Sequence, residues 1–151
     1  MKPTFDVAEV VPQSATMSLL THITDYGDDH VRTAVTIGPD SLFCDRQGVP
    51  AWVGLEYMAQ SIGAFAGIHE RLNGQAPQIG FLVGSRRYQC NQPVFPVGTK
   101  LEITAERSYQ ADNGLGVFNC TIEGDGILAT AALNVYQPDD VDAFLQGTDN
   151  E

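Results

Sequence analysis

The longest apolar stretch of the chain covers residues 49–72 and predicts one long, almost wholly buried helix. Pro50 fits the first turn of such a helix, because its missing N–H has no intrahelical acceptor there, and Asn73-Gly74 is a plausible end. An apolar stripe with helical spacings of three and four runs along it and consists of Leu55, Met58, Ile62 and Phe65. We expect this helix to form the centre of the fold.

Strand-like patterns lie on both sides of the helix. Apolar and polar residues alternate over 30–37, and this segment and residues 17–24 predict a hairpin. Short helical turns are predicted at residues 5–11 and 139–146. Turn signals rich in Gly, Pro, Asp and Asn separate four later strands, which are Ile79–Gln89, Lys100–Gln110, Val117–Glu123 and Ile127–Tyr136. The order predicts an α+β fold in which a curved antiparallel sheet of about six strands wraps one central helix. Its edges would be left unpaired, so dimerisation by edge pairing is expected.

Length and charge narrow the classes of protein. A chain of 151 residues is most simply one domain, so we expect residues 1–138 to form it and residues 139–151 to form an acidic tail. The chain has eight Lys and Arg residues and nineteen Asp and Glu residues, which gives a net charge of −11. This argues against nucleic acid and anionic membranes as partners, since both attract basic surfaces. Solubility is the other explanation of the acidity.

Other sequence features mainly argue against secretion, disulfide bonds, cofactors and metals. The N-terminal residues lack the apolar core of a secretory signal, so we expect a cytoplasmic protein. Cys44, Cys90 and Cys120 are widely spaced with no Cys-x-x-Cys pair, which favours reduced structural thiols. The chain has no phosphate-binding Gly-rich loop and no His-Glu-x-x-His motif, and we predict neither a cofactor nor a metal. Each of His22, His30 and His69 is expected to have an ordinary structural or surface role.

Glu56 is the one charged residue between Arg46 and His69. A carboxylate in an apolar helix has a raised pKa, a specific partner or a pocket reached by solvent, and each of these also describes a catalytic acid. The alternative is a side chain that leaves the core at an irregular edge. A membrane span is disfavoured, because Glu56, Gln60 and Ser61 interrupt the apolar run before the roughly 20 residues that a bilayer requires.

Two segments of the chain carry recognisable motifs, residues 49–60 at the predicted helix start and residues 90–101, which include Pro93-Val94 and Pro96. The first is similar to the pattern Pro-Gly-x-x-x-x-Glu-Ala-x-Ala-Gln and the second to the pattern Phe-x-x-Pro-Val-x-Pro-Gly-Asp-x-Leu. Both patterns belong to the hotdog-fold 3-hydroxyacyl-carrier-protein dehydratases, which this chain therefore resembles. The Pro-Ala-Trp at 50–52 and the Ile-Gly-x-Leu-x-Gly at 79–84 look like the branch found in aryl polyene pigment clusters. The resemblance spans residues 10–138 and implies a hotdog fold that acts on acyl-carrier-protein or coenzyme A thioesters.

The family mechanism assigns roles to individual residues here. In the family a histidine takes the α-proton of the thioester, and an acid on the helix of the neighbouring subunit assists departure of the hydroxyl as water. By resemblance Glu56 matches this acid, and Gln60 one turn on would orient it. Backbone N–H groups of Ala51 and Trp52 match those that polarise the thioester carbonyl.

The histidine is missing. Leu42 stands fourteen residues before Glu56, where common family members have it, and Gln13 stands where the pigment branch has it. Because glutamine cannot take a proton near neutral pH, the acid–base pair is incomplete within this chain. Three functions remain open: a dehydratase with a base we cannot name or one from another chain, a weakly active or silent hotdog partner of an active dehydratase, and a thioesterase using Glu56. The assembly would be a homodimer or a heterodimer with another hotdog protein.

Arg86 and Arg87 form the only adjacent basic pair. Acyl-carrier proteins are acidic, so this pair is a candidate contact for the carrier, with a charged edge strand as the alternative.

Overall fold

The computed structural model describes residues 4–6, 19–74, 81–110 and 115–136. Strands β1 (His22–Tyr26) and β2 (His30–Thr36) form the predicted hairpin, and β3 (Gly48–Pro50) leads into a 3-10 turn, η1 (Ala51–Val53), and the helix α2 (Gly54–Leu72). Five strands follow, which are β4 (Phe81–Cys90), β5 (Val94–Pro96), β6 (Lys100–Gln110), β7 (Leu115–Gly124) and β8 (Ile127–Tyr136). The expected α+β order is confirmed.

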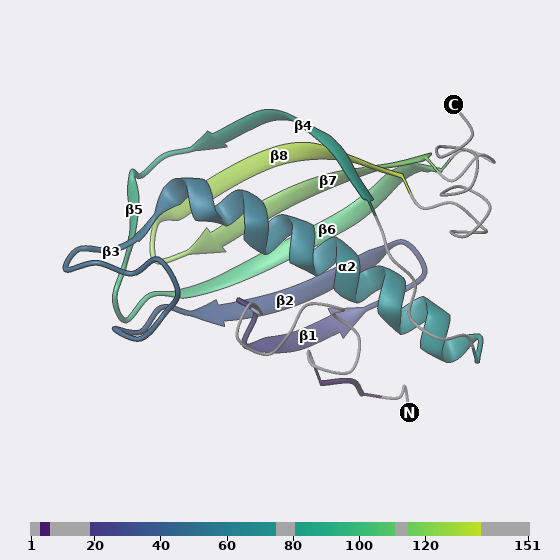
Figure 1. Ribbon diagram of the computed structural model, residues 1–151, viewed down its shortest axis with the longest axis horizontal. Helices are drawn as coiled ribbons and strands as arrows, with labels where there is room; N and C mark the ends of the chain where they lie inside the picture. The colour runs from purple at the N-terminus through teal and green to yellow at the C-terminus, as the bar shows by residue number, and fades with distance from the viewer. Residues whose placement is uncertain (1–3, 7–18, 75–80, 111–114, 137–151) are drawn as a thin grey trace, which may run out of the picture.

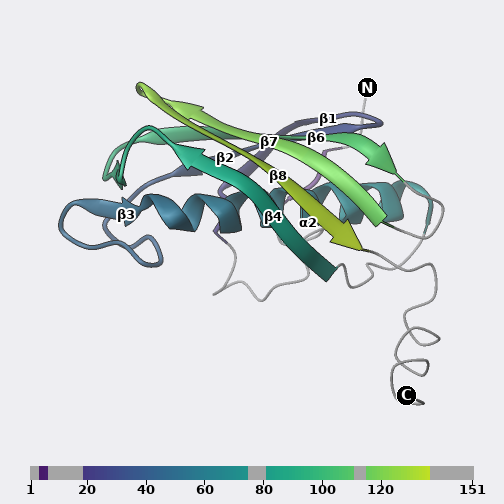
Figure 2. The same ribbon diagram turned by 90° about the horizontal axis from the view of Figure 1, so that it is seen from above.

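Six strands form one antiparallel sheet in the order β1-β2-β6-β7-β8-β4, and β3 pairs with β5 in a separate two-stranded sheet. The large sheet curves around α2, which lies along its concave face (Figure 1). In the view from above, the helix and the sheet form two layers (Figure 2). Strands β1 and β4 are the two edges, so each has one side without a neighbouring strand among the described residues.

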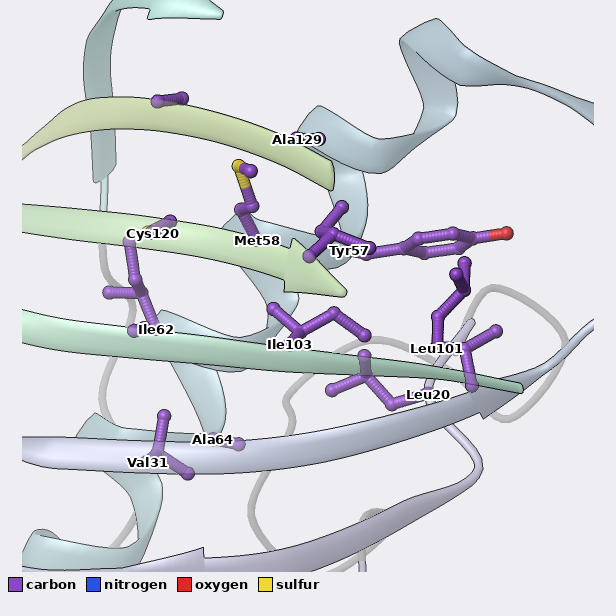
Figure 3. Close-up of a cluster of buried hydrophobic side chains, with 14 of the residues drawn as sticks. Leu20, Val31, Tyr57, Met58, Ile62, Ala64, Leu101, Ile103, Cys120 and Ala129 are labelled. Carbon is purple, nitrogen blue, oxygen red and sulfur yellow. The ribbon is translucent and has the colours of Figure 1, made fainter. Parts of the chain in front are cut away.

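Alternation in the strands explains this packing. In β2, β7 and the first half of β6, as far as Ala105, every second side chain is buried against α2, as Val31, Ile103 and Ile122 show with no exposed surface. Met58 and Tyr57 fill the space from the helix side (Figure 3). Each such side chain contributes about 1.5–3 kcal/mol through burial, so this shared apolar layer holds the helix in place.

The start of the helix differs from the prediction. Val49 and Pro50 are extended and pair with Phe95 and Val94, so neither belongs to the helix. The α-helix begins at Gly54, after the 3-10 turn. The apolar pattern does not distinguish these conformations, because a buried strand that runs straight into a buried helix gives one continuous apolar run.

Several other predictions can be compared with the described residues. The strands at 100–110 and 127–136 have the predicted bounds, while the predicted strand at 117–123 extends to Leu115 and Gly124. The short strands β3 and β5 were not predicted. The predicted turns at 5–11 and 139–146 lie wholly or mostly outside the described residues, as do residues 17–18, 79–80 and the proposed tail. None of the helices among the described residues meets the length and apolarity needed to cross a membrane.

Candidate functional site

Glu56 lies in the first turn of α2 and is exposed, which corrects the expectation of a buried carboxylate. Trp52, four residues earlier, is 62% exposed, and Ala59 and Gly63 along the same side are only half-buried. This side of the helix faces away from the sheet. The sequence pattern predicted a helix buried on all sides, but the described residues leave the surface around Trp52 and Glu56 uncovered.

Gln60 is the buried member of this face, with 1% of its surface exposed. Its Oε1 accepts a hydrogen bond of 2.8 Å from the backbone N–H of Leu19, and its Nε2 donates to Glu56 Oε1 at 3.3 Å. Since the Leu19 N–H can only donate, the amide oxygen must face Leu19 and the NH₂ must face Glu56. The contact expected between Gln60 and Glu56 is therefore present, and the partly buried N–H of Leu19 fixes the orientation of the Gln60 amide.

The two N–H groups proposed at the helix start differ in their surroundings. The Ala51 N–H donates to the carbonyl oxygen of Pro93 at 2.9 Å, so it is already occupied. The Ala51 carbonyl accepts from the Tyr88 hydroxyl and from the Gly54 N–H. Trp52 N–H lies in the first turn, where N–H groups have no acceptor within the helix. Of the two candidates, Trp52 is the one that remains for a substrate carbonyl.

The loop between β2 and β3 reaches the helix start. Phe43 is 49% exposed, and its ring centroid lies 5.4 Å from that of Trp52. Its φ of 67° is a left-handed conformation that is strained for a bulky side chain. Hydrogen bonds on either side hold the loop, with Cys44 N donating to Ser41 O at 3.0 Å and Asp45 N to Gly48 O at 2.9 Å. The loop therefore presents Phe43 outward at a cost in backbone strain.

Leu42 occupies the family's histidine position in this same loop and is 38% exposed. The resemblance thus places a side chain that cannot exchange a proton beside the helix start. Gln13, the other position where a histidine was expected, lies outside the described residues.

The three histidines lie elsewhere. His30 Nε2 is 3.0 Å from Asp25 Oδ2, and His69 Nε2 is 2.8 Å from the carbonyl oxygen of Gly27. His22 is exposed at the start of β1. His69 is thirteen residues beyond Glu56, which is about 20 Å along a helix. The described residues therefore contain no histidine in hydrogen-bond reach of Glu56, and His30 and His69 have the structural contacts that were expected of them.

Two tyrosines lie beneath the helix start. Burial, with a smaller effect of Cys44, raises the pKa of Tyr57 to about 12. Burial also raises the pKa of Tyr88 far above its usual range, with smaller effects of Cys90 and Tyr57. Both hydroxyls stay protonated near neutral pH, so neither acts as a base, and the Tyr88 hydroxyl donates to the Ala51 carbonyl oxygen. No sequence pattern pointed to Tyr88, because its contact with Ala51 joins residues 37 positions apart.

The basic pair lies on the edge strand β4. Arg87 is exposed, with φ of 58°, inside an irregularity of the β4–β8 pairing between Arg86 and Gln89. The simple alternation expected for this pair therefore does not apply at the bulge. The structure does not describe the Arg86 side chain.

Among the described residues, one long helix lies on the concave face of a curved antiparallel sheet, and this arrangement defines a hotdog fold, here with a carboxylate in the first helical turn. The family model described as ApeP-like, ApeP dehydratase, matches residues 5–146. The chain belongs to this family.

Solved structures agree with this assignment. A chain of the dehydratase heterocomplex ApeI:P from Xenorhabdus doucetiae is 30% identical, with a TM-score of 0.83 over 95% of this chain and 98% of that chain. The E. coli PaaI protein from the phenylacetic acid degradation operon is 14% identical, with a TM-score of 0.59 over 76% of this chain and 81% of that one. A hypothetical thioesterase with coenzyme A from Streptococcus pneumoniae TIGR4 is also 14% identical, with a TM-score of 0.58 over 76% and 83%.

The last two similarities concern the fold alone. A search of curated proteins found no significant match. The predicted family and the dehydratase-like function are confirmed, while the roles of individual residues stay predictions.

Proposed function

We propose that the chain takes part in removing water from 3-hydroxyacyl thioesters on an acyl-carrier protein, in synthesis of the aryl polyene type. A base takes the α-proton, the bond between C3 and the hydroxyl oxygen breaks, and protonated Glu56 gives its proton to the departing hydroxyl. The products are an enoyl thioester and water. Trp52 N–H would hold the thioester carbonyl as negative charge develops on its oxygen.

The observation that carries this proposal is the hydrogen-bonded series from Leu19 N–H through Gln60 to Glu56. It holds the carboxylate of Glu56 in one direction, one helical turn beyond Trp52. Oriented groups of this kind are what a proton transfer requires, because a misplaced acid loses much of its effect.

We propose that another hotdog chain supplies the base. His30 and His69 are engaged elsewhere, His22 is exposed at the start of β1, and Leu42 cannot exchange a proton. The exposed side of α2 around Trp52 and Glu56, together with the free edge of β4, offers a surface for such a chain. The similarity to a chain of a dehydratase heterocomplex supports a heterodimer over a homodimer.

A silent partner is the second candidate, and Leu42 at the family's histidine position favours it. In that case this chain would stabilise an active paralogue, and Glu56 would be dispensable. We also propose that the protein is located in the cytoplasm. We further propose that the acyl-carrier protein contacts Arg86 and Arg87.

The test is to incubate the purified chain, alone and with a dehydratase-like chain encoded beside it, with a 3-hydroxyacyl-carrier thioester. Mass spectrometry distinguishes loss of water, loss of the acyl group and no change. Glu56→Gln should abolish water loss in the complex, whereas Glu102→Gln, which removes an exposed carboxylate on β6, should not. Full activity of Glu56→Gln in the complex would favour the silent partner, and release of the free acid would indicate a thioesterase.

A further inference from the structure

The peptide group between Ala51 and Trp52 has its carbonyl side fixed by two donors. The Tyr88 hydroxyl and the Gly54 N–H both donate to the Ala51 carbonyl oxygen. A peptide group is planar and trans, so its C=O and N–H point in opposite directions. Fixing the Ala51 carbonyl therefore also fixes the direction of the Trp52 N–H.

Tyr88 is packed closely against the turn that it contacts. A Cβ built on Gly54 would lie 2.3 Å from the Tyr88 hydroxyl oxygen, so Tyr88 occupies the space that glycine leaves at this position. Burial keeps this hydroxyl protonated near neutral pH, as described above, and it remains a donor there.

The preceding peptide group is fixed from a different side. The Ala51 N–H donates to Pro93 O, and Pro50 pairs with Val94 in the small sheet of β3 and β5. The backbone before the helix is thus held by the β4–β5 connection, and Tyr88 on β4 adds the bond that sets the next peptide plane. These contacts leave the Trp52 peptide little freedom to rotate.

We propose that Tyr88 is a positioning residue that directs the Trp52 N–H at the thioester carbonyl and strengthens it as a donor. This inference rests on the proposed function, in which that N–H receives the developing negative charge. A carbonyl that accepts hydrogen bonds polarises its own peptide group, so the N–H on the other side becomes a better donor. A donor fixed in advance needs no reorganisation during the reaction, which is how such groups stabilise a transition state.

The chain has one tryptophan, and this allows a direct test. Labelling with ¹⁵N-tryptophan gives one backbone amide signal, from Trp52, and one indole signal. The probe is S-butyryl-pantetheine, which lacks the 3-hydroxyl group and cannot lose water. We expect the saturating probe to shift the NMR signal of the Trp52 amide proton downfield, in the full chain alone and in its mixture with the dehydratase-like chain. In the Tyr88→Phe variant, this change in chemical shift should be clearly smaller.

Tyr57→Phe is the matched control, since it removes a neighbouring buried hydroxyl but no bond to Ala51. It should keep the wild-type movement, and the indole signal reports whether each variant is folded. In the active complex, Tyr88→Phe should lower kcat about tenfold with KM nearly unchanged, less than the ~10²–10³ lost with a complete oxyanion donor.

An unmoved Trp52 amide in the wild-type chain and complex, or equal movement in Tyr88→Phe, would overturn the inference. Water loss is measured separately by mass spectrometry. Movement of the amide without water loss would contradict the proposed dehydration and leave the role of Tyr88 intact. Water loss with an unshifted Trp52 amide signal would support the proposed dehydration and contradict the role given to Tyr88.

Discussion

The amide nitrogen of Gln60 donates to the Glu56 carboxylate from a position that solvent does not reach, whereas Glu56 itself is exposed. A buried group thus orients an exposed one. This arrangement suits a carboxylate that becomes enclosed only when another molecule covers the helix, because the orientation is already fixed before that happens.

The first prediction concerns Gln60. Gln60→Leu removes the donor to Glu56 and leaves the Leu19 N–H without its acceptor. We expect kcat of the complex to fall about tenfold with little change in KM, because the acid loses orientation and not substrate contact. Chemical denaturation should show a loss of about 1–3 kcal/mol from the unmatched N–H. Unchanged kcat in a folded variant would contradict the role given to Gln60.

The second prediction concerns Gly54. Gly54→Ala places a methyl group 2.3 Å from the Tyr88 hydroxyl oxygen and 2.9 Å from Ile122 Cδ1. We expect a loss of about 1–3 kcal/mol in the free energy of unfolding, measured by urea denaturation. Gly63→Ala is the control, because nothing lies within 4 Å of its Cβ position. It should stabilise the isolated chain by about 0.5–1 kcal/mol through helix propensity. Equal effects of the two substitutions would show that the contact with Tyr88 is unimportant.

The third prediction separates strain from packing at Phe43, whose φ is 67°. Phe43→Ala removes the ring and keeps the strain, while Phe43→Gly removes both. We therefore expect Phe43→Gly to be more stable than Phe43→Ala by about 1 kcal/mol in thermal or urea unfolding. Both should weaken association with the partner chain if the loop belongs to the interface, which titration calorimetry can measure. Equal stability of the two variants would argue against a strained loop.

The fourth prediction concerns alkaline pH. The pKa of Tyr57 is raised by burial to about 12, and that of the Cys120 thiol is also raised by burial to about 12. Protonated groups with a folded-state pKa above the unfolded value stabilise the protein below the unfolded pKa, and this contribution is lost as pH rises through the folded pKa. The free energy of unfolding should therefore decline between about pH 9 and pH 12.

Tyr57→Phe tests the assignment, because it should reduce this decline above pH 10. Tyrosinate absorbance offers a second measurement, because the difference between the wild-type chain and Tyr57→Phe isolates the ionisation of Tyr57, whose pKa burial raises to about 12. Ionisation of Tyr57 near the usual tyrosine pKa of about 10 in the folded chain would contradict the burial described for it.

The fold was predictable because its signals are local. Turn residues separated the strands at 100–110 and 127–136 from their neighbours and gave them their correct bounds. The site was only partly predictable. The spacing of Glu56 and Gln60 predicted their contact, but an apolar pattern does not reveal whether a helix side is covered by the same chain or by another. This is why Glu56 was expected to be buried. Tyr88 was missed because its bond to Ala51 depends on how β4 curves over the helix start.

The bulge at Arg87 restricts which chains can extend the sheet. A strand that docks along the free side of β4 meets two irregularities in the backbone of that strand, one between Leu82 and Gly84 and one between Arg86 and Gln89, where Arg87 has a φ of 58°. A perfectly regular strand would lose its register there, whereas one with complementary breaks could continue past them. The edge thus discriminates among sister chains by backbone shape, and not by side-chain identity alone.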